Sequence, residues 1–155
     1  MTVKVNMVGE EAIFMEEIDF VVEMEPIVQK RARATTVGGK VRMYDPSSKD
    51  KSKFLDACLD HAPAEPFEGP VSVSIEAGFT RPKSHYGTGK NANKLKPSAP
   101  EFHTQKCDVD NIAKIKLDAL NGVFWTDDRV IDQLIVTKRW AEEGYTRMTI
   151  TGTYE

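Results

Sequence analysis

Acidic side chains gather in one stretch of the chain, residues 106–132, at spacings that could hold a metal ion. Asp108 and Asp110 stand two positions apart before an amphipathic pattern, and Asp127 and Asp128 follow after that pattern ends. No His or Cys pair lies nearby, and carboxylate oxygens suit Mg²⁺, a hard cation that keeps several waters. The spacing therefore predicts a magnesium site, with Mn²⁺ as the alternative ion.

A helix is expected to separate the two carboxylate pairs. Apolar residues recur at three- and four-residue spacing from Asp110 to Asn121, which predicts about 18 Å of helix at ~1.5 Å per residue. Asp108 or Asp110 suits the N-cap of this helix, and Asn121-Gly122 suits its C-terminal end. The chain must then return if the second carboxylate pair is to face the first.

Lys114 lies four residues after Asp110, on the same face of the expected helix and within reach of a bound phosphate. Asp118 continues that face, where it could pair with Lys114. A competing interpretation makes Asp110 a helix cap, Lys114 a solvated partner and Asp127-Asp128 an ordinary acidic turn. Short patterns of this kind are common, so the four carboxylates alone do not decide between the two interpretations.

The wider pattern of this stretch resembles the signature of the RusA family of Holliday junction resolvases. The matching residues are Lys106, Asp108, Asp110, Asn111, Lys114, 117–122 (LDALNG), Trp125, Asp127, Asp128 and Ile131. The segment from Pro26 to Arg33 agrees more loosely with the family. Many members carry Pro where this chain has Cys107, a change that removes a stiff residue but no candidate ligand.

The resemblance implies a Mg²⁺-dependent endonuclease of DNA recombination and repair that resolves four-way junctions by paired symmetric nicks. Asp108, Asp110 and Asp128 would be its metal-binding catalytic carboxylates, and Lys114 a catalytic or phosphate-contacting residue. Asp127 is a further candidate ligand, although the family's emphasis falls on the second Asp of its pair. A homodimer is expected, because two symmetric nicks need two sites related by the same two-fold symmetry. Many family members are borne by phages and prophages, so the expected location is the cytoplasm of a bacterium or phage-infected cell.

Charge is segregated along the chain, although its 155 residues carry a formal net charge of only −3. The net charge is −6 over residues 1–25, +6 over residues 28–53 and +5 over residues 81–106. Such segregation can leave one face basic and able to bind phosphates, while solvated surface is the competing interpretation for each basic segment alone. The cations expected to contact DNA are Lys30, Arg31, Arg33, Arg81, Lys83, Lys90, Lys94, Lys96 and Lys106.

The remaining sequence predicts one α+β domain over residues 1–155, with a mixed, mostly antiparallel sheet packed against two main helices. Strands are expected at Ile18–Met24, Lys40–Tyr44 and Val71–Phe79, and a final antiparallel hairpin at Val130–Trp140 and Tyr145–Tyr154. The first helix is expected to run from Ser47 or Ser48 to about His61, burying Phe54, Leu55, Cys58 and Leu59. Residues 1–16 show no clear pattern beyond a short helix or an irregular lead-in, and residues 81–106 are expected to form a flexible basic loop.

Several classes of protein are disfavoured by the same sequence. The two cysteines, Cys58 and Cys107, fit a reducing compartment better than a disulfide framework. No apolar run reaches about 18 residues, so no membrane span is expected, and the N-terminus lacks the layout of an export signal. His61, His85 and His103 are expected at the surface. The alternatives to a nuclease are a non-catalytic branched-DNA-binding protein and a metal-dependent hydrolase of small phosphate esters, which the basic segments disfavour.

Overall fold

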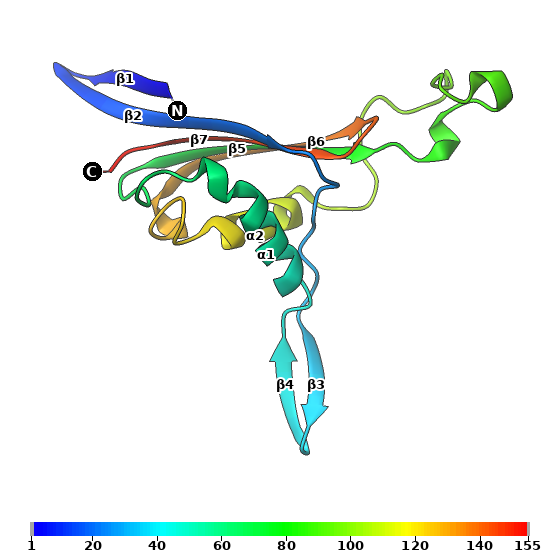
Figure 1. The fold of residues 1–155 in the computed structure, drawn as a ribbon, viewed down its shortest axis with the longest axis horizontal. Coiled ribbons are helices and arrows are strands. Elements are labelled where there is room, and N and C mark those ends of the chain that lie inside the picture. Colours follow the sequence, from blue (N-terminus) through cyan, green and yellow to red (C-terminus); the bar gives the residue numbers. More distant parts are fainter. Residues whose placement is uncertain (1, 155) are drawn as a thin grey trace.

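A five-stranded sheet with both α-helices on one face forms the body of the protein in the computed structural model, which describes residues 2–154 (Figure 1). The strands, in sheet order, are β1 (Thr2–Val8), β2 (Glu11–Val22), β7 (Tyr145–Gly152), β5 (Val71–Thr80) and β6 (Ile131–Ala141). The helices are α1 (Ser48–Cys58) and α2 (Val109–Leu120). Neighbouring strands are antiparallel except β5 and β6, which are parallel. The predicted α+β class is therefore confirmed.

The two faces of the sheet differ because polar and apolar residues alternate along its central strands. On β5, Val71, Val73, Ile75 and Ala77 are fully buried in one core cluster with residues of both helices. The opposite face is polar and carries ion pairs, of which Arg139–Glu76 has an N–O distance of 2.7 Å. The helices thus cover only the apolar face.

The final hairpin predicted from the sequence is wrong, although both of its strands exist. β5 lies between β6 and β7, pairing parallel with β6 and antiparallel with β7. The short connection from Ala141 to Tyr145 therefore passes the end of β5 instead of joining two paired strands. Burial explains this arrangement, because β5 is the most buried strand and an interior position in the sheet covers it on both edges.

The N-terminal segment is a strand hairpin and neither a helix nor an irregular lead-in. β1 pairs with the first half of β2 around a turn at Gly9, whose φ is 64°. The expected strand at Ile18–Met24 is therefore longer at its start, and it ends at Val22. Large apolar side chains such as Val3 and Phe14, which are 66% and 68% exposed, remain uncovered on this hairpin.

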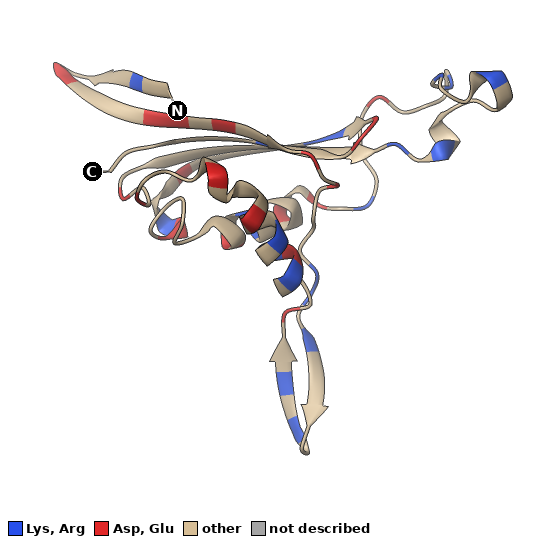
Figure 2. Ribbon diagram, viewed as in Figure 1, with Lys and Arg blue, Asp and Glu red and all other residues tan. Residues whose placement is uncertain are grey.

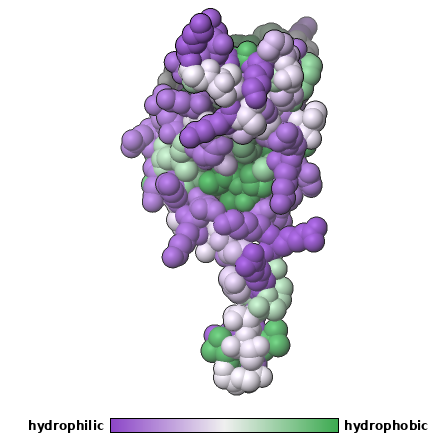
Figure 3. Space-filling view, turned by 90° about the vertical axis from the view of Figure 1, so that its right-hand side faces the viewer, coloured by the Kyte–Doolittle hydropathy of each residue, from purple (hydrophilic) through white to green (hydrophobic). Residues whose placement is uncertain are grey.

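A second hairpin, β3 (Arg33–Val37) and β4 (Lys40–Tyr44), projects from the body as an arm (Figures 1 and 3). All ten of its strand residues are exposed. The strand expected at Lys40–Tyr44 is confirmed, whereas the expected turn narrows to Gly38-Gly39, with φ values of 58° and 75°. Opposite pairs in the register place Ala34, Thr36, Val41 and Met43 on one face of the arm and its basic residues on the other.

The first helix follows Ser47 as expected and ends at Cys58, with a 3-10 turn at Leu59–His61. Burial of Phe54 and Cys58 is confirmed, but Leu59 is 47% exposed because it lies beyond the last α-helical residue. Within the described residues, no helix is long and apolar enough to cross a membrane.

Two of the three histidines expected at the surface are buried. His85 and His103 are each 7% exposed and both pack against Trp140 of β6, with His103 stacked on its ring at a centroid distance of 3.9 Å. These contacts anchor both ends of the loop formed by residues 81–106. The polar composition of the loop does not predict this anchoring. His61 is exposed as expected and stacks on Phe20.

Candidate functional site

The first turn of α2 presents two of the predicted carboxylates to solvent. Asp108 is the N-cap residue, and its backbone oxygen accepts hydrogen bonds of 3.1 Å from the amides of Asn111 and Ile112. The Asp108 side chain makes no capping hydrogen bond. Asp110 is exposed within the first turn and is not the cap. Both carboxylates are therefore available to a ligand.

Asp108 and Asp110 line an open pocket of about 640 Å³ together with Lys114. The other lining residues are Gln29, Lys30, Arg31, Ala32, Asp45, Lys51, Asn111 and Asp118. The fold thus brings two predicted metal ligands and three predicted phosphate-binding cations, Lys30, Arg31 and Lys114, to one pocket. These groups come from segments about 80 residues apart in the sequence.

Residues 29–32 form one wall of the pocket and are fixed to both helices. The Gln29 amide donates to the backbone oxygen of Asn111 on α2 at 3.1 Å. The Lys30 amide donates to Ser47 Oγ at the start of α1 at 2.8 Å. Ser47 therefore holds the pocket wall and does not use its side chain to cap α1. These bonds set the position of Lys30 and Arg31 relative to the carboxylates.

Sequence reasoning missed Asp45, a fourth carboxylate of the pocket beside Asp108, Asp110 and Asp118. Its Oδ2 accepts a hydrogen bond of 2.6 Å from Lys51, which also lies 3.5 Å from Asp118. The hydrogen bond from Lys51 lowers the pKa of Asp45, so this carboxylate stays ionised while it is engaged with a cation. Asp118 thus pairs with Lys51 and not with Lys114. The Asp45-Pro46-Ser47 sequence indicates a helix start, but nothing in it predicts that Asp45 lies in the same pocket as Asp110.

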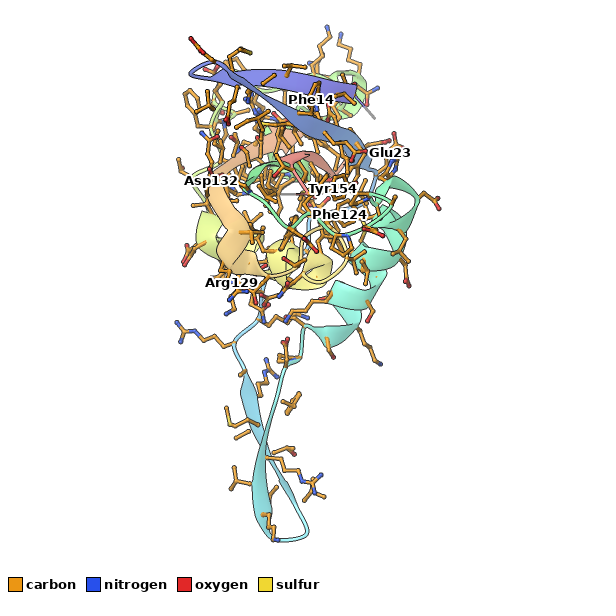
Figure 4. The ribbon with its side chains drawn as sticks, turned by 90° about the vertical axis from the view of Figure 1, so that its left-hand side faces the viewer. Phe14, Glu23, Phe124, Arg129, Asp132 and Tyr154 are labelled. Atoms are coloured by element: carbon orange, nitrogen blue, oxygen red, sulfur yellow. The ribbon has the colours of Figure 1, made fainter. Side chains whose placement is uncertain are left out.

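The second predicted carboxylate pair lies outside this pocket. Asp128 Oδ1 accepts a hydrogen bond of 2.7 Å from the indole of Trp125, which is fully buried. Asp127 caps the short turn at Asp128–Val130, accepting from the Arg129 amide at 3.0 Å. Arg129 and Asp132, on either side of the start of β6, lie across the molecule from α1 (Figure 4). Within residues 2–154, no three acidic, His or Cys side chains are grouped closely enough to hold a metal ion.

The donor set at the start of α2 nevertheless fits a hard divalent cation. Asp108, Asp110 and Asn111 offer oxygen ligands, and Mg²⁺ commonly takes one or two protein carboxylates, with waters and substrate phosphates completing its shell. Lys30, Arg31 and Lys114 supply the positive charge that such a phosphate needs. The pocket can therefore hold a cation and a phosphate together.

The remaining predicted DNA-binding cations lie on projections from the body. Arg33 is at the base of the arm, and the other six lie along residues 81–106: Arg81, Lys83, Lys90, Lys94, Lys96 and Lys106. None of these seven lines the pocket. Basic residues mark the arm and this loop, whereas acidic residues mark the N-terminal hairpin (Figure 2). The segregation seen in the sequence is thus also a segregation in space.

Comparison with known proteins connects this pocket to an activity. A family model described as "Endodeoxyribonuclease RusA" matches residues 23–151, which include every residue of the pocket. The chain belongs to the RusA endodeoxyribonuclease family. This family cuts DNA at branched junctions in recombination, so the predicted family and its nuclease class are confirmed. Among relatives, an "Uncharacterized protein YqaN" of Bacillus subtilis (strain 168) is 35% identical over 134 residues, covering 83% of this chain and 92% of that protein.

Two local features distinguish this chain from the pattern of the RusA family. β1 and all of β2 lie before the matched residues, so the N-terminal hairpin is additional to the part of the fold that the family model describes. Cys107, where many members have Pro, has a φ of 107°. A proline ring fixes φ near about −65° and could not adopt this conformation. The approach to Asp108 is therefore built differently in this chain.

Proposed function

We propose that the protein is a Mg²⁺-dependent endodeoxyribonuclease that resolves Holliday junctions by paired symmetric nicks, with Mn²⁺ as the alternative ion. The observation that carries the proposal is the shared pocket of Asp108, Asp110 and Lys114 within the RusA-family match. Its expected place of action is the cytoplasm of a bacterium or phage-infected cell, during recombination and repair.

Asp108 and Asp110 would hold the cation beside the scissile phosphate. A divalent ion bound there supplies Lewis-acid polarisation of the phosphate and makes a water a better nucleophile. Lys114, one helical turn after Asp110, would contact a non-bridging phosphate oxygen and balance the charge that develops during the reaction. Because the pocket is open on one side, a DNA backbone can reach it without a change in the fold.

Asp128 is proposed as the third carboxylate of this site, with Asp127 as a less favoured candidate. The hydrogen bond from Trp125 fixes the Asp128 carboxylate at the end of the segment that follows α2. Asp127 already uses one oxygen to cap the following turn. Asp108 caps the N-terminal end of α2, whereas Asp128 follows its C-terminal end, so a shared site requires a rearrangement of this segment when metal and DNA bind.

The arm and the loop of residues 81–106 would contact the arms of the junction outside the pocket. Lys30 and Arg31 would bind the phosphates nearest to the cut, and Arg33 would extend that track onto the arm. The six loop cations would bind a second stretch of backbone, since phosphate contacts position a protein on DNA without reading its sequence. A two-fold dimer would provide one such set for each of the two nicked strands.

Cleavage of a labelled synthetic four-way junction tests the proposal. The wild type with Mg²⁺ is expected to give paired, symmetric nicks, and Asp110→Asn or chelation of the metal is expected to give none. Asp60→Asn is a matched control, because this exposed Asp lies beyond the C-terminal end of α1, away from the pocket.

Three outcomes would contradict all or part of the proposal. Tight junction binding without nicks under Mg²⁺ or Mn²⁺ would indicate a non-catalytic branched-DNA-binding protein. Hydrolysis of a small phosphate ester that junction DNA does not inhibit would indicate a different hydrolase. Equal cutting of linear duplex and junction DNA would retain the nuclease but remove its preference for branched structure.

A further inference from the structure

The residue before Asp108 has an unusual backbone conformation. Cys107 has a φ of 107°, and it is the one non-glycine residue among those described with a positive φ. The side chain of an L-residue is crowded in this region, so the conformation persists only where neighbouring contacts hold it. Because Asp108 follows directly, the direction of its carboxylate depends on this turn.

Lys138 of β6 supplies the contacts that hold the turn. Its Nζ donates to the backbone oxygen of Gln105 at 2.6 Å and to that of Cys107 at 2.8 Å. Among the described residues no ion pair uses this ammonium group, so its charge is directed at the two carbonyls. Charge-assisted hydrogen bonds of this kind are stronger than neutral ones.

The surroundings make Lys138 a rigid support. It is half-buried and pairs with Ala77 of β5, an interior strand of the sheet and the most buried one. Trp140, two residues further on the same face of β6, stacks on His103 and anchors the chain just before the turn. Desolvation and the charge of Lys138 both lower the pKa of His103, which keeps this ring neutral beside the ammonium group.

We propose that Lys138 is a positioning residue for the nuclease reaction: it clamps the peptide of Cys107 in its positive-φ conformation and so aims Asp108 into the pocket. The inference rests on the proposed function for the role of Asp108, but the clamp itself is a property of the folded chain. Proline cannot adopt a φ of 107°, so in this chain the turn before Asp108 is held by a side chain of the sheet and not by a proline ring.

The test compares Lys138→Met with wild type in two independent measurements. Lys138→Met keeps an unbranched side chain and loses the donor. Its cleavage rate at saturating Mg²⁺ is expected to fall about 10- to 100-fold, as for other residues that orient a metal ligand, with unchanged affinity for the junction. The second measurement is the rate at which iodoacetamide alkylates Cys107, read by mass spectrometry, and this rate is expected to rise. Cys58 is fully buried and serves as the internal unreactive thiol.

Rescue and control variants separate positioning from general damage. Cys107→Gly in the Lys138→Met background is expected to restore most of the cleavage rate, because glycine adopts a positive φ without a steric penalty. Lys138→Arg, which keeps a cationic donor, is expected to restore part of it. Arg139→Met removes the neighbouring cation on the opposite face of β6 and is expected to change neither measurement. If Lys138→Met does not fold, as judged by its thermal midpoint, Lys138→Gln replaces it.

The outcomes are distinct from those that test the proposed function. Unchanged cleavage and unchanged alkylation in Lys138→Met would overturn the inference, and so would a double variant no faster than Lys138→Met. If the wild type cuts no junction, the proposed function fails, and the alkylation rate alone then decides whether Lys138 holds the turn.

Discussion

Asp108 and Asp110 lie at the N-terminus of α2, where the helix dipole favours negative charge. Peptide dipoles stabilise anions at the N-terminus of a helix, whether those anions are carboxylates or a phosphate. Two carboxylates beside a DNA phosphate repel it unless a cation lies between them. The same two residues should therefore weaken DNA binding in the absence of metal and support catalysis in its presence.

Asp110→Asn tests this dual role, because the substitution removes one negative charge and keeps the size of the side chain. In metal-free buffer the variant is expected to bind a four-way junction as tightly as wild type or a few-fold more tightly, as seen by fluorescence anisotropy. With Mg²⁺ it is expected to cut none. Weaker metal-free binding by Asp110→Asn than by the control Asp60→Asn would contradict the repulsion and point to a direct contact with DNA.

Lys116 of α2 is a fully buried lysine beneath the pocket wall, and it gives a prediction about stability. Its Nζ donates to the backbone oxygens of Ile27 at 3.0 Å and Ile112 at 3.3 Å, and it lies 5.7 Å from the centre of the Phe54 ring. Burial lowers its pKa from 10.5 to about 8, against a smaller opposing effect of Cys58. The unfolded chain therefore binds this proton more tightly than the folded one, so stability must rise with pH between about 8 and 10.5.

Urea unfolding at pH 7, 8 and 9 measures that linkage. The unfolding free energy of wild type is expected to gain about 1 kcal/mol between pH 8 and pH 9 relative to Lys116→Met. Cys58, whose pKa burial raises to about 12, opposes this gain above pH 9, but it is present in both proteins. Parallel pH profiles for the two proteins would show that the folded state keeps Lys116 charged throughout.

At the scale of elements, local signals in the sequence predicted the strands and helices well and their pairing less well. The alternation of Val71–Phe79 and the apolar spacing after Asp110 indicate β5 and α2 correctly, because burial of one face imposes its period on the sequence. Insertion of β5 between β6 and β7 is a long-range event. Four residues of turn composition between two strands are compatible with a hairpin, and only the pairing of β5 with both strands excludes it.

For the candidate site too, the sequence predicted local groupings but not contacts between distant segments. The Asp108–Lys114 cluster could be predicted because its members lie on the first two turns of one helix, whose geometry follows from spacing. Asp45 and the wall at residues 29–32 could not, because the hydrogen bonds that hold them to α2 and to each other join distant segments. The same applies to the burial of His85 and His103, which depends on Trp140 of β6.

The arm is an element with two different faces, and its basic face makes a prediction about DNA. Arg33, Arg42 and Lys40 lie on that face. Changing all three to Gln is expected to reduce the slope of log affinity against log salt by as much as about 0.9 for each DNA phosphate that these cations neutralise. The thermal midpoint should stay unchanged, because all of these side chains are exposed. Lys4→Gln, which removes a cation from the N-terminal hairpin, is the control; an equal effect of both changes would contradict a specific role of the arm.

At the scale of the whole molecule, basic and acidic side chains occupy different projections from the body. The acidic N-terminal hairpin lies at one end of the sheet, while the basic loop and the basic face of the arm extend in other directions (Figures 1 and 2). We therefore expect a junction that approaches the pocket to be attracted by the cations of both projections and repelled at the hairpin. Within residues 2–154, one chain offers one such pocket, at the start of α2, whereas the proposed resolution of a junction needs two nicks.

A mixed dimer tests whether each of two protomers makes one of the two nicks. Wild type and Asp110→Asn, carrying different affinity tags, are co-expressed and purified through both tags, so that each dimer holds one active pocket. On a supercoiled plasmid with an extruded cruciform, the wild-type homodimer is expected to give linear product, because it cuts both strands before it dissociates. The mixed dimer is expected to give only nicked circles, since its second pocket lacks a carboxylate that the cation needs. Linear product from the mixed dimer at the wild-type rate would mean that one pocket makes both cuts, and a monomer mass at working concentration would remove the dimer altogether.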